Sequence, residues 1–323
     1  MKPWKIDREQ HNIEDIPTVF ATPRFTFPFT LVGRPFPNLE SFPVTKLKPD
    51  MVAVINPAVN IRTEFFGAIC FKHLLQEETA YGFITYVNKL GALILHYCDG
   101  KNTIAGIHGR IAEVNSGVTF DKVTKFIAKL LSDISILQIA GRQVQNAPCF
   151  TPDLTLWNST MERLSAPLRL YLNITKRCNL RCKHCYADAG RGTKDLDRAV
   201  VDRVLNEARD LMIPSIVLIG GEPLLYRDFT GLVKEANSAG ISVVTATNAM
   251  LIDERRAVEL REAGLKVISI SVDGANEESH DFIRGKGSYQ KTFAGVKNCV
   301  KTGIKVTIST TFTSKTIGEL PLL

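Results

Sequence analysis

From Leu168 onward the chain repeats one unit, in which a short apolar segment is followed by a longer amphipathic segment. The apolar segments are rich in β-branched residues and have the length of buried strands, whereas the segments between them have helical periodicity. Three helical segments end in a glycine, a common helix terminator, directly before the next apolar segment. These glycines are Gly240, Gly264 and Gly303. The predicted strands are 168–174, 215–219, 241–247, 266–272 and 304–311.

This alternation predicts a parallel sheet, because two strands that are joined through a helix run in the same direction. We therefore expect an α/β fold, with a partial parallel (β/α) barrel over 166–323 and with functional loops after the carboxyl ends of its strands. The pattern stops after the fifth strand. A barrel that ended there would leave its last strand uncovered. We expect this domain to be incomplete at its C-terminus, either as a fragment or beside a partner chain that covers the gap.

Other kinds of sequence precede the repeat. Residues 1–50 hold 8 of the 15 prolines and six phenylalanines, which predicts an irregular extension that lies on a neighbouring surface. Residues 51–140 predict a small α+β domain, and the polar, proline-containing residues 141–165 predict a linker. The elements expected within 51–140 are a strand at 59–65, a turn at Gly67, a returning strand at 68–71, and helices at 88–98, 104–114 and 123–134.

Composition and charge exclude several classes of protein. The chain is 45% hydrophobic and 23% charged, and its net charge of +7 is spread thinly over all regions. A disordered chain and a nucleic-acid-binding patch are therefore not expected. No apolar run is long enough to span a bilayer, and the N-terminus lacks the pattern of a signal peptide. We expect a cytoplasmic protein that binds neither nucleic acid nor membrane, with reduced cysteines.

Three cysteines follow the first predicted strand, with the spacing Cys178-x3-Cys182-x2-Cys185. A tetrahedral zinc site needs a fourth ligand, and His184, the only local candidate, lies between two of the cysteines, where sharing one ion is awkward. A [4Fe–4S] cluster with three cysteine ligands and one open iron fits better. A zinc knuckle and three incidental core cysteines are the alternatives.

A second signal ends the next predicted strand, where residues 219–223 read IGGEP. Glycines let a ligand approach the backbone closely, and Glu222 offers a carboxylate to a cation such as an amino group. A Gly-Gly-Glu segment alone is usually just a turn. Its place on the strand next to the cysteine loop makes the two motifs a joint signal.

Together, CNLRCKHC after the first strand and GGEP after the second resemble the radical S-adenosylmethionine (SAM) superfamily over 166–323. The resemblance implies that Cys178, Cys182 and Cys185 hold a [4Fe–4S] cluster whose open iron binds SAM. Thr247 departs from the glycine that often ends the third strand in this family. The further SAM contacts implied are His184 near the adenine, Gly220, Gly221 and Glu222 at the amino group, Ser271, and Arg284 at the carboxylate.

A looser resemblance covers the α+β domain. The segments INP at 55–57, YVN at 86–88 and LHYCDGKNT at 95–103, together with Arg62, are similar to the peptide-binding chaperone of pyrroloquinoline quinone biosynthesis (PqqD-like), which has a winged-helix-like fold. That fold binds precursor peptides by adding a strand to its sheet edge, expected here near 59–71. A winged-helix DNA reader is the alternative, although the domain lacks the concentrated Lys and Arg that phosphate contacts need.

These resemblances imply an enzyme whose reduced cluster cleaves SAM to methionine and a 5′-deoxyadenosyl radical, which takes hydrogen from a peptide or protein substrate. The implied setting is peptide maturation or cofactor biosynthesis, with a precursor peptide and a flavodoxin or ferredoxin electron donor as partners. Two alternatives stay open: a radical SAM enzyme that acts on a small molecule, and a non-catalytic, truncated module that binds peptide and cluster. Because Cys299 is the only cysteine after the motif, we expect one cluster per chain.

Overall fold

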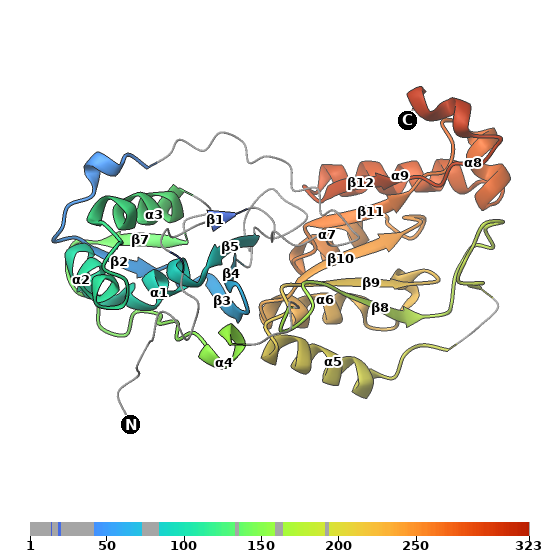
Figure 1. Ribbon diagram of the computed structural model, residues 1–323. Helices are drawn as coiled ribbons and strands as arrows, with labels where there is room; N and C mark the ends of the chain where they lie inside the picture. Colours follow the sequence, from blue (N-terminus) through green and yellow to red (C-terminus); the bar gives the residue numbers. More distant parts are fainter. Residues whose placement is uncertain are drawn as a thin grey trace. The chain divides into compact units, whose positions relative to one another are not determined.

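The chain forms two compact units, and each has a buried hydrophobic core of its own (Figure 1). The first unit comprises 1–73 and 83–165, and the second comprises 74–82 and 166–323. Among the helices of the described residues, none has both the length and the apolar character that crossing a membrane requires. The residues that this computed structural model describes are 14, 19–20, 42–72, 84–132, 136–158, 164–190 and 194–322.

The described part of the first unit contains two antiparallel sheets. Their strands are β1 (Val19–Phe20), β2 (Val52–Ile55), β3 (Val59–Glu64), β4 (Gly67–Lys72), β5 (Ile84–Asn88), β6 (Asp99–Thr103) and β7 (Leu137–Ala140). One sheet has the order β1-β5-β4-β3 and the other β6-β2-β7. Gly67 makes the predicted turn between β3 and β4 at a φ of +143°, which disfavours other residues. Because β4 lies inside its sheet, the edge predicted near 59–71 is reduced to β3.

The helices of the first unit pack their apolar faces into its core. They are α1 (Lys89–Tyr97), α2 (Ile104–Val114), α3 (Phe120–Ser132) and α4 (Leu154–Trp157). Asn88 and Thr103 cap α1 and α2, because their side chains accept the backbone N–H groups of Gly91 and Gly106. The segment predicted as a linker contains α4, whose Trp157 is buried and donates its indole N–H to the Gly67 carbonyl at 3.1 Å.

The second unit is built on a parallel sheet, as the sequence predicts. Its described strands are β8 (Leu170–Thr175), β9 (Ser215–Gly220), β10 (Ser242–Thr247), β11 (Val267–Ser271) and β12 (Lys305–Ser309), in the order β12-β11-β10-β9-β8. The connecting helices are α5 (Arg198–Asp210), α6 (Phe229–Ser238), α7 (Glu254–Glu262), α8 (Glu277–Arg284) and α9 (Ser288–Lys301). Gly240, Gly264 and Gly303 have φ values of +80°, +95° and +78°, which confirms them as helix terminators.

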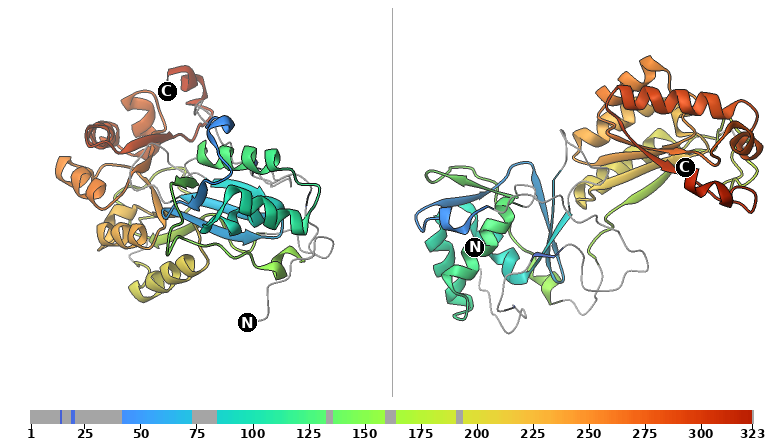
Figure 2. Two further views of the ribbon diagram at one scale, coloured as in Figure 1. Left: turned by 90° about the vertical axis from the view of Figure 1, so that its left-hand side faces the viewer. Right: turned by 90° about the horizontal axis from the view of Figure 1, so that it is seen from above.

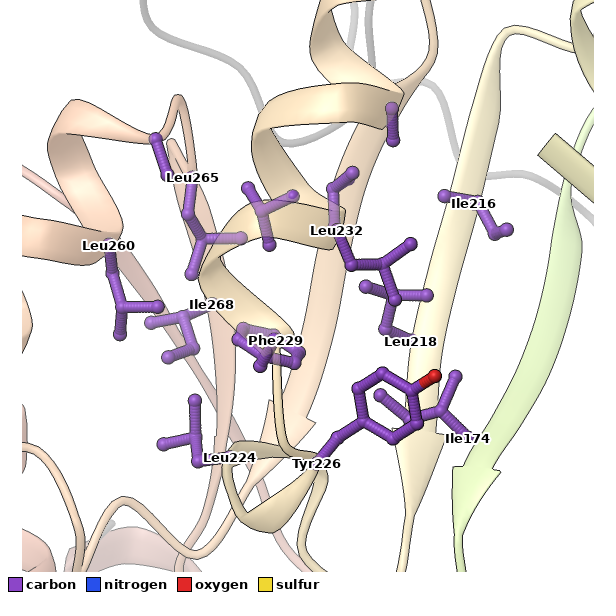
Figure 3. Close-up of a cluster of buried hydrophobic side chains, with 14 of the residues drawn as sticks. Ile174, Ile216, Leu218, Leu224, Tyr226, Phe229, Leu232, Leu260, Leu265 and Ile268 are labelled. Carbon is purple, nitrogen blue, oxygen red and sulfur yellow. The ribbon is translucent and has the colours of Figure 1, made fainter. Parts of the chain in front are cut away.

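Sequential strand order determines where these helices lie. Right-handed connections between neighbouring parallel strands bring successive helices to the same side of a sheet, and α5, α6, α7 and α9 line one face (Figure 2). Figure 3 shows Phe229 and Leu232 of α6 beside Leu218 of β9 in the resulting core. The strands therefore end side by side at one edge of the sheet, and the loops that leave this edge carry both sequence motifs.

Candidate functional site

The cysteine motif lies in the loop that leaves β8. The thiols of Cys178, Cys182 and Cys185 are free and partly exposed. The backbone N–H groups of Leu180 and Ala189 each donate to a motif sulfur, Cys178 Sγ and Cys185 Sγ, at 3.4 Å. Partial burial raises the pKa of Cys178 and of Cys182, and the nearby Arg284 guanidinium acts against this increase at Cys182. Backbone donors and a nearby cation are both suited to thiolate ligands.

The start of this loop is held by Asp195. Its carboxylate accepts the Thr175 hydroxyl at 2.6 Å and two N–H groups of Arg177, from Nε at 2.9 Å and from Nη2 at 2.7 Å. Arg177 also donates to the Leu225 carbonyl beyond β9. A bidentate Arg–carboxylate pair has a defined geometry. The loop therefore leaves β8 in one direction, toward the end of β9.

The glycines of the second motif pack directly against the cysteine loop. The N–H of Gly221 donates to the Thr175 carbonyl, and the N–H of Glu222 donates to the Arg177 carbonyl, both at 2.8 Å. A Cβ atom on Gly221 would lie 2.2 Å from the Arg177 oxygen, and one on Gly220 would lie 2.5 Å from the Thr175 oxygen. The backbone of the cysteine loop therefore fills the space that a side chain at either position would need. This explains why both residues are glycine, a reason that the sequence did not reveal. Their contact with SAM stays a prediction.

Glu222 is fully buried where β9 meets β10. Its carboxylate accepts the Thr247 hydroxyl at 2.6 Å, the Asn248 N–H at 2.9 Å and the Leu224 N–H at 3.2 Å. Burial raises the pKa of Glu222, while these donors oppose the increase. An ionised carboxylate has about four acceptor positions, and these described donors occupy three of them. Thr247, which departs from the family glycine, is here a partner of Glu222.

The end of β10 also contacts the cysteine loop through a pair that the sequence did not reveal. The side-chain N–H of Asn248 donates to the side-chain oxygen Oδ1 of Asn179 at 2.7 Å. Asn179 directly follows Cys178, and the backbone of Asn248 holds Glu222. Both asparagines were detectable only as polar residues after predicted strands, a weak signal because such loops are often polar.

The remaining predicted residues meet at the end of β11. Ser271 is the last residue of that strand and is partly exposed. Asp273, two residues further on, is fully buried, accepts from Arg284 Nε at 2.5 Å, and lies 2.8 Å from His184 Nε2. The structure therefore brings His184 and Arg284 together through Asp273. The sequence offers Asp273 only as one polar residue of a strand-end loop.

The donor set fits an iron–sulfur cluster. Among the described residues, no three His, Cys, Asp or Glu side chains are grouped so that they could hold a single metal ion. In a [4Fe–4S] cluster each cysteine binds a different iron, so the thiols need not meet at one ion. The loop offers three accessible thiols, backbone N–H groups directed at two of the sulfurs, and a nearby cation. These are features that an anionic cluster requires.

Relatives with curated functions match about half of the chain. Fe-coproporphyrin III synthase of Methanosarcina barkeri is 33% identical over 153 residues, which are 47% of this chain and 38% of that protein. Mycofactocin maturase MftC of Mycolicibacterium smegmatis is 31% identical over 159 residues, 49% of this chain and 41% of that protein. The matches thus span less than half the length of these two relatives.

A likeness in fold extends over both units. The structure of Streptococcus suis SuiB bound to its precursor peptide SuiA aligns with 83% of this chain and 60% of that chain, with a TM-score of 0.55 and 22% identity. At this identity the likeness concerns the fold alone.

Residues 172–320 match the Radical SAM superfamily. This match contains most of β8, the strands β9–β12, the cysteine loop and the Gly-Gly-Glu turn. The family implies SAM and a [4Fe–4S] cluster as cofactors. Over residues 172–320 the second unit is therefore similar to the Radical SAM superfamily in sequence and has the parallel α/β fold expected from that likeness.

Proposed function

We propose that this chain is a radical SAM enzyme that modifies a peptide or protein, with Cys178, Cys182 and Cys185 as ligands of one [4Fe–4S] cluster. The observation that carries the proposal is the loop of three accessible thiols, held against the Gly-Gly-Glu turn at the carboxyl ends of parallel strands. When bound, the reduced cluster and SAM supply a 5′-deoxyadenosyl radical that abstracts hydrogen.

The residues of this chain would bind and orient the cofactors. Glu222 has one acceptor position left for the SAM amino group, and Arg284, whose Nε is held by Asp273, offers its Nη groups to the SAM carboxylate. His184, Gly220, Gly221 and Ser271 complete the proposed SAM contacts. The buried position of Glu222 excludes water from its carboxylate, which strengthens a charge-assisted hydrogen bond there.

Exposed basic residues favour an acidic reducing partner. Lys176, Arg181 and Lys183 all lie in the cysteine loop with exposed side chains. A flavodoxin or ferredoxin as electron donor is therefore part of the proposal, because complementary charge steers association. Raising the salt concentration should slow reduction by such a protein but not by dithionite.

The first unit is proposed to bind the peptide through a strand edge, as PqqD-like domains do. Both ends of the sheet β1-β5-β4-β3 already have neighbours from this chain. At β3, the Thr63 hydroxyl accepts the Asp153 N–H at 3.0 Å, and the Glu64 carboxylate accepts the Ser165 N–H at 2.6 Å, so two side chains of this strand hold neighbouring segments. At β5 the neighbour is the two-residue strand β1, with Val19 opposite Val87 and Phe20 opposite Tyr86. The shorter neighbour is the easier one to replace, so we place the peptide along β5.

A synthetic peptide tests this edge. A fluorescent peptide with the sequence of residues 12–22 should bind a chain that lacks residues 1–22, and should bind the full chain weakly, because β1 competes there. A peptide with Val19→Pro, which loses a backbone donor, should bind less tightly. A folded, truncated chain that ignores the first peptide would contradict the proposed edge.

The chemistry has its own test. Anaerobically reconstituted chain, given dithionite and SAM, should release 5′-deoxyadenosine, measured chromatographically per cluster, and Cys182→Ala should release none. A cluster-loaded chain that makes none, either by itself or as part of a longer chain of the same protein, would contradict the enzymatic assignment.

The second candidate is a radical SAM enzyme that acts on a small molecule. One observation favours it, since the name of the Methanosarcina relative specifies Fe-coproporphyrin III rather than a peptide. Failure of both the truncated and the full chain to bind extended peptides, with deoxyadenosine still formed, would favour this candidate.

A further inference from the structure

Asp273 is a buried carboxylate that connects three separate segments. One oxygen, Oδ2, accepts from Arg284 Nε at 2.5 Å and lies 2.8 Å from His184 Nε2, while Oδ1 accepts the Thr311 N–H at 2.9 Å. Its side chain is completely inaccessible to solvent. A buried carboxylate is costly unless it is paired and hydrogen-bonded. These three contacts therefore determine where the Asp273 carboxylate can lie, and the carboxylate in turn determines where its partners lie.

His184 is the partner of Asp273 that belongs to the cysteine loop, between Cys182 and Cys185. Because its Nε2 faces the Asp273 carboxylate, the ring orientation is determined by that contact. Its other nitrogen, Nδ1, is buried and has no hydrogen-bond partner within the described residues. A carboxylate that orients an imidazole beside metal ligands is a recurring arrangement in metalloproteins.

Helix α8 also contacts the cysteine loop directly, at Lys183, the residue before His184. The backbone N–H of Lys183 donates to the Ile283 carbonyl at 2.9 Å, and the Lys183 ammonium lies 3.2 Å from the centre of the Phe282 ring. Arg284, the next residue of α8, pairs with Asp273. Residues 183 and 184 are thus attached to 282–284, through one backbone contact and one ionic network.

We propose that Asp273 is a positioning residue that holds His184 and the Arg284 charge beside the cysteine loop, and so sets the electrostatic environment of the cluster. The inference rests on the proposed function of the three cysteines. Charges and hydrogen bonds around a cluster shift its reduction potential. Asp273 supplies one negative charge, and it also holds the positive charge of Arg284, which acts on Cys182.

The variant Asp273→Asn tests this role. Asparagine has nearly the same size and can still accept the Thr311 N–H, but it carries no charge and forms weaker contacts with Arg284 and His184. We expect the variant to bind about four irons, with a midpoint potential more positive than that of the wild type, because the Arg284 charge is no longer balanced. The spectrum of the reduced cluster in electron paramagnetic resonance should change as well. Asp273→Glu, which retains the charge, should restore most of the wild-type potential.

Asp281→Asn is the matched control. Asp281 lies on α8, the helix that carries Arg284, and its carboxylate accepts the Ser288 hydroxyl and the Tyr289 N–H. Its replacement therefore destabilises α8. This variant should unfold at a lower temperature but retain the wild-type potential and spectrum. A purely structural role of Asp273 predicts the same behaviour for both variants.

The outcomes separate this inference from the proposed function. A wild-type chain that takes up no iron contradicts both. A cluster-loaded Asp273→Asn variant with unchanged potential and spectrum contradicts the inference alone. If Asp273→Asn fails to load, Arg284→Gln carries the test, because loss of the positive charge should move the potential in the negative direction. An unchanged potential in that variant overturns the inference.

Discussion

Among the described residues, each unit buries one arginine–carboxylate pair, and the two pairs hold different kinds of segment. In the first unit, Arg62 Nε lies 2.7 Å from Glu64 Oε1, with exposed fractions of 4% and 0%. In the second, Arg284 Nε lies 2.5 Å from Asp273 Oδ2, with exposed fractions of 11% and 0%. The burial and the chemistry are nearly the same.

The further partners of the two carboxylates make the difference. Glu64 also accepts the N–H and the hydroxyl of Ser165, at 2.6 Å and 3.0 Å, and so attaches the last residue of the first unit to its sheet. Asp273 instead contacts His184, in the loop that carries the cysteines. A buried ion pair is therefore not a functional signal by itself, because its meaning depends on the segment that it holds.

Among these predictions, replacing a motif cysteine of the second unit should have the largest effect, because it removes a ligand of the proposed cluster. Replacing Cys178, Cys182 or Cys185 by alanine should abolish the cluster, measured as iron and sulfide per chain after anaerobic reconstitution. Cys299→Ala, in the core behind the sheet, should still bind about four irons. Stoichiometric zinc without iron in the wild type would contradict the cluster, and about eight irons per chain would contradict the expectation of a single cluster.

Breaking the pair of the first unit should have the next largest effect. Glu64→Gln leaves the Arg62 charge buried, which costs about 3–5 kcal/mol of unfolding free energy. The measurement is chemical denaturation, followed by tryptophan fluorescence, to which the buried Trp157 contributes. Glu113→Gln, which breaks the exposed pair with Arg110, should cost about 0–1 kcal/mol. Equal effects of the two variants would remove the distinction between buried and exposed pairs.

Glu222 is a third buried carboxylate, and its hydrogen-bond donors among the described residues are neutral groups. Glu222→Gln removes the charge offered to the SAM amino group, a loss of about 1.5–3 kcal/mol or about ten- to a hundred-fold in SAM affinity. Isothermal titration with SAM, on cluster-loaded chain, measures this. Thr247→Ala, which removes a donor to Glu222 but no charge, should weaken SAM binding less. Unchanged affinity in Glu222→Gln would show that another group holds the amino group.

Lys266 is the opposite of these buried carboxylates, because its ammonium is a buried cation. The Lys266 ammonium has no hydrogen-bond partner among the described residues, and burial, with the nearby Arg261, lowers the pKa of Lys266 to about 8. Since this pKa lies below the ordinary value of 10.5, the charged form destabilises the fold below pH 8. That cost fades as the pH rises toward 10.5.

Lys266→Met should therefore stabilise the chain slightly at neutral pH. At pH 7 we expect the melting temperature to rise by about 2–4 °C, as about 1 kcal/mol gives in a domain of this size, and the gain should vanish near pH 10.5. Lys297→Met, at an exposed position, should show no such pH dependence. A gain that is independent of pH would point to packing rather than charge.

Much of the second unit could be predicted from local patterns. The five strands, the glycines that end the helices and the cysteine loop after β8 all lie within short windows of sequence, where periodicity and backbone preference act. The first unit was harder to predict, because β6 follows directly where a helix was expected to end and α4 lies in the expected linker. In both places contacts with distant segments outweighed weak local preference.

The sequence by itself therefore determined the parallel strands, the order of the loops and the residue types of the candidate site, because strand and helix periods are local properties. Only the tertiary structure decided which polar and charged groups lie in contact with one another. Glu64 and Ser165 are 101 positions apart, and Asp273 reaches His184 only because β8 and β11 end at the same edge of one sheet. The same holds for Gly221, whose missing side chain makes room for the Arg177 carbonyl. Such pairings depend on which segments the sheet brings together, and no short window of sequence contains that information.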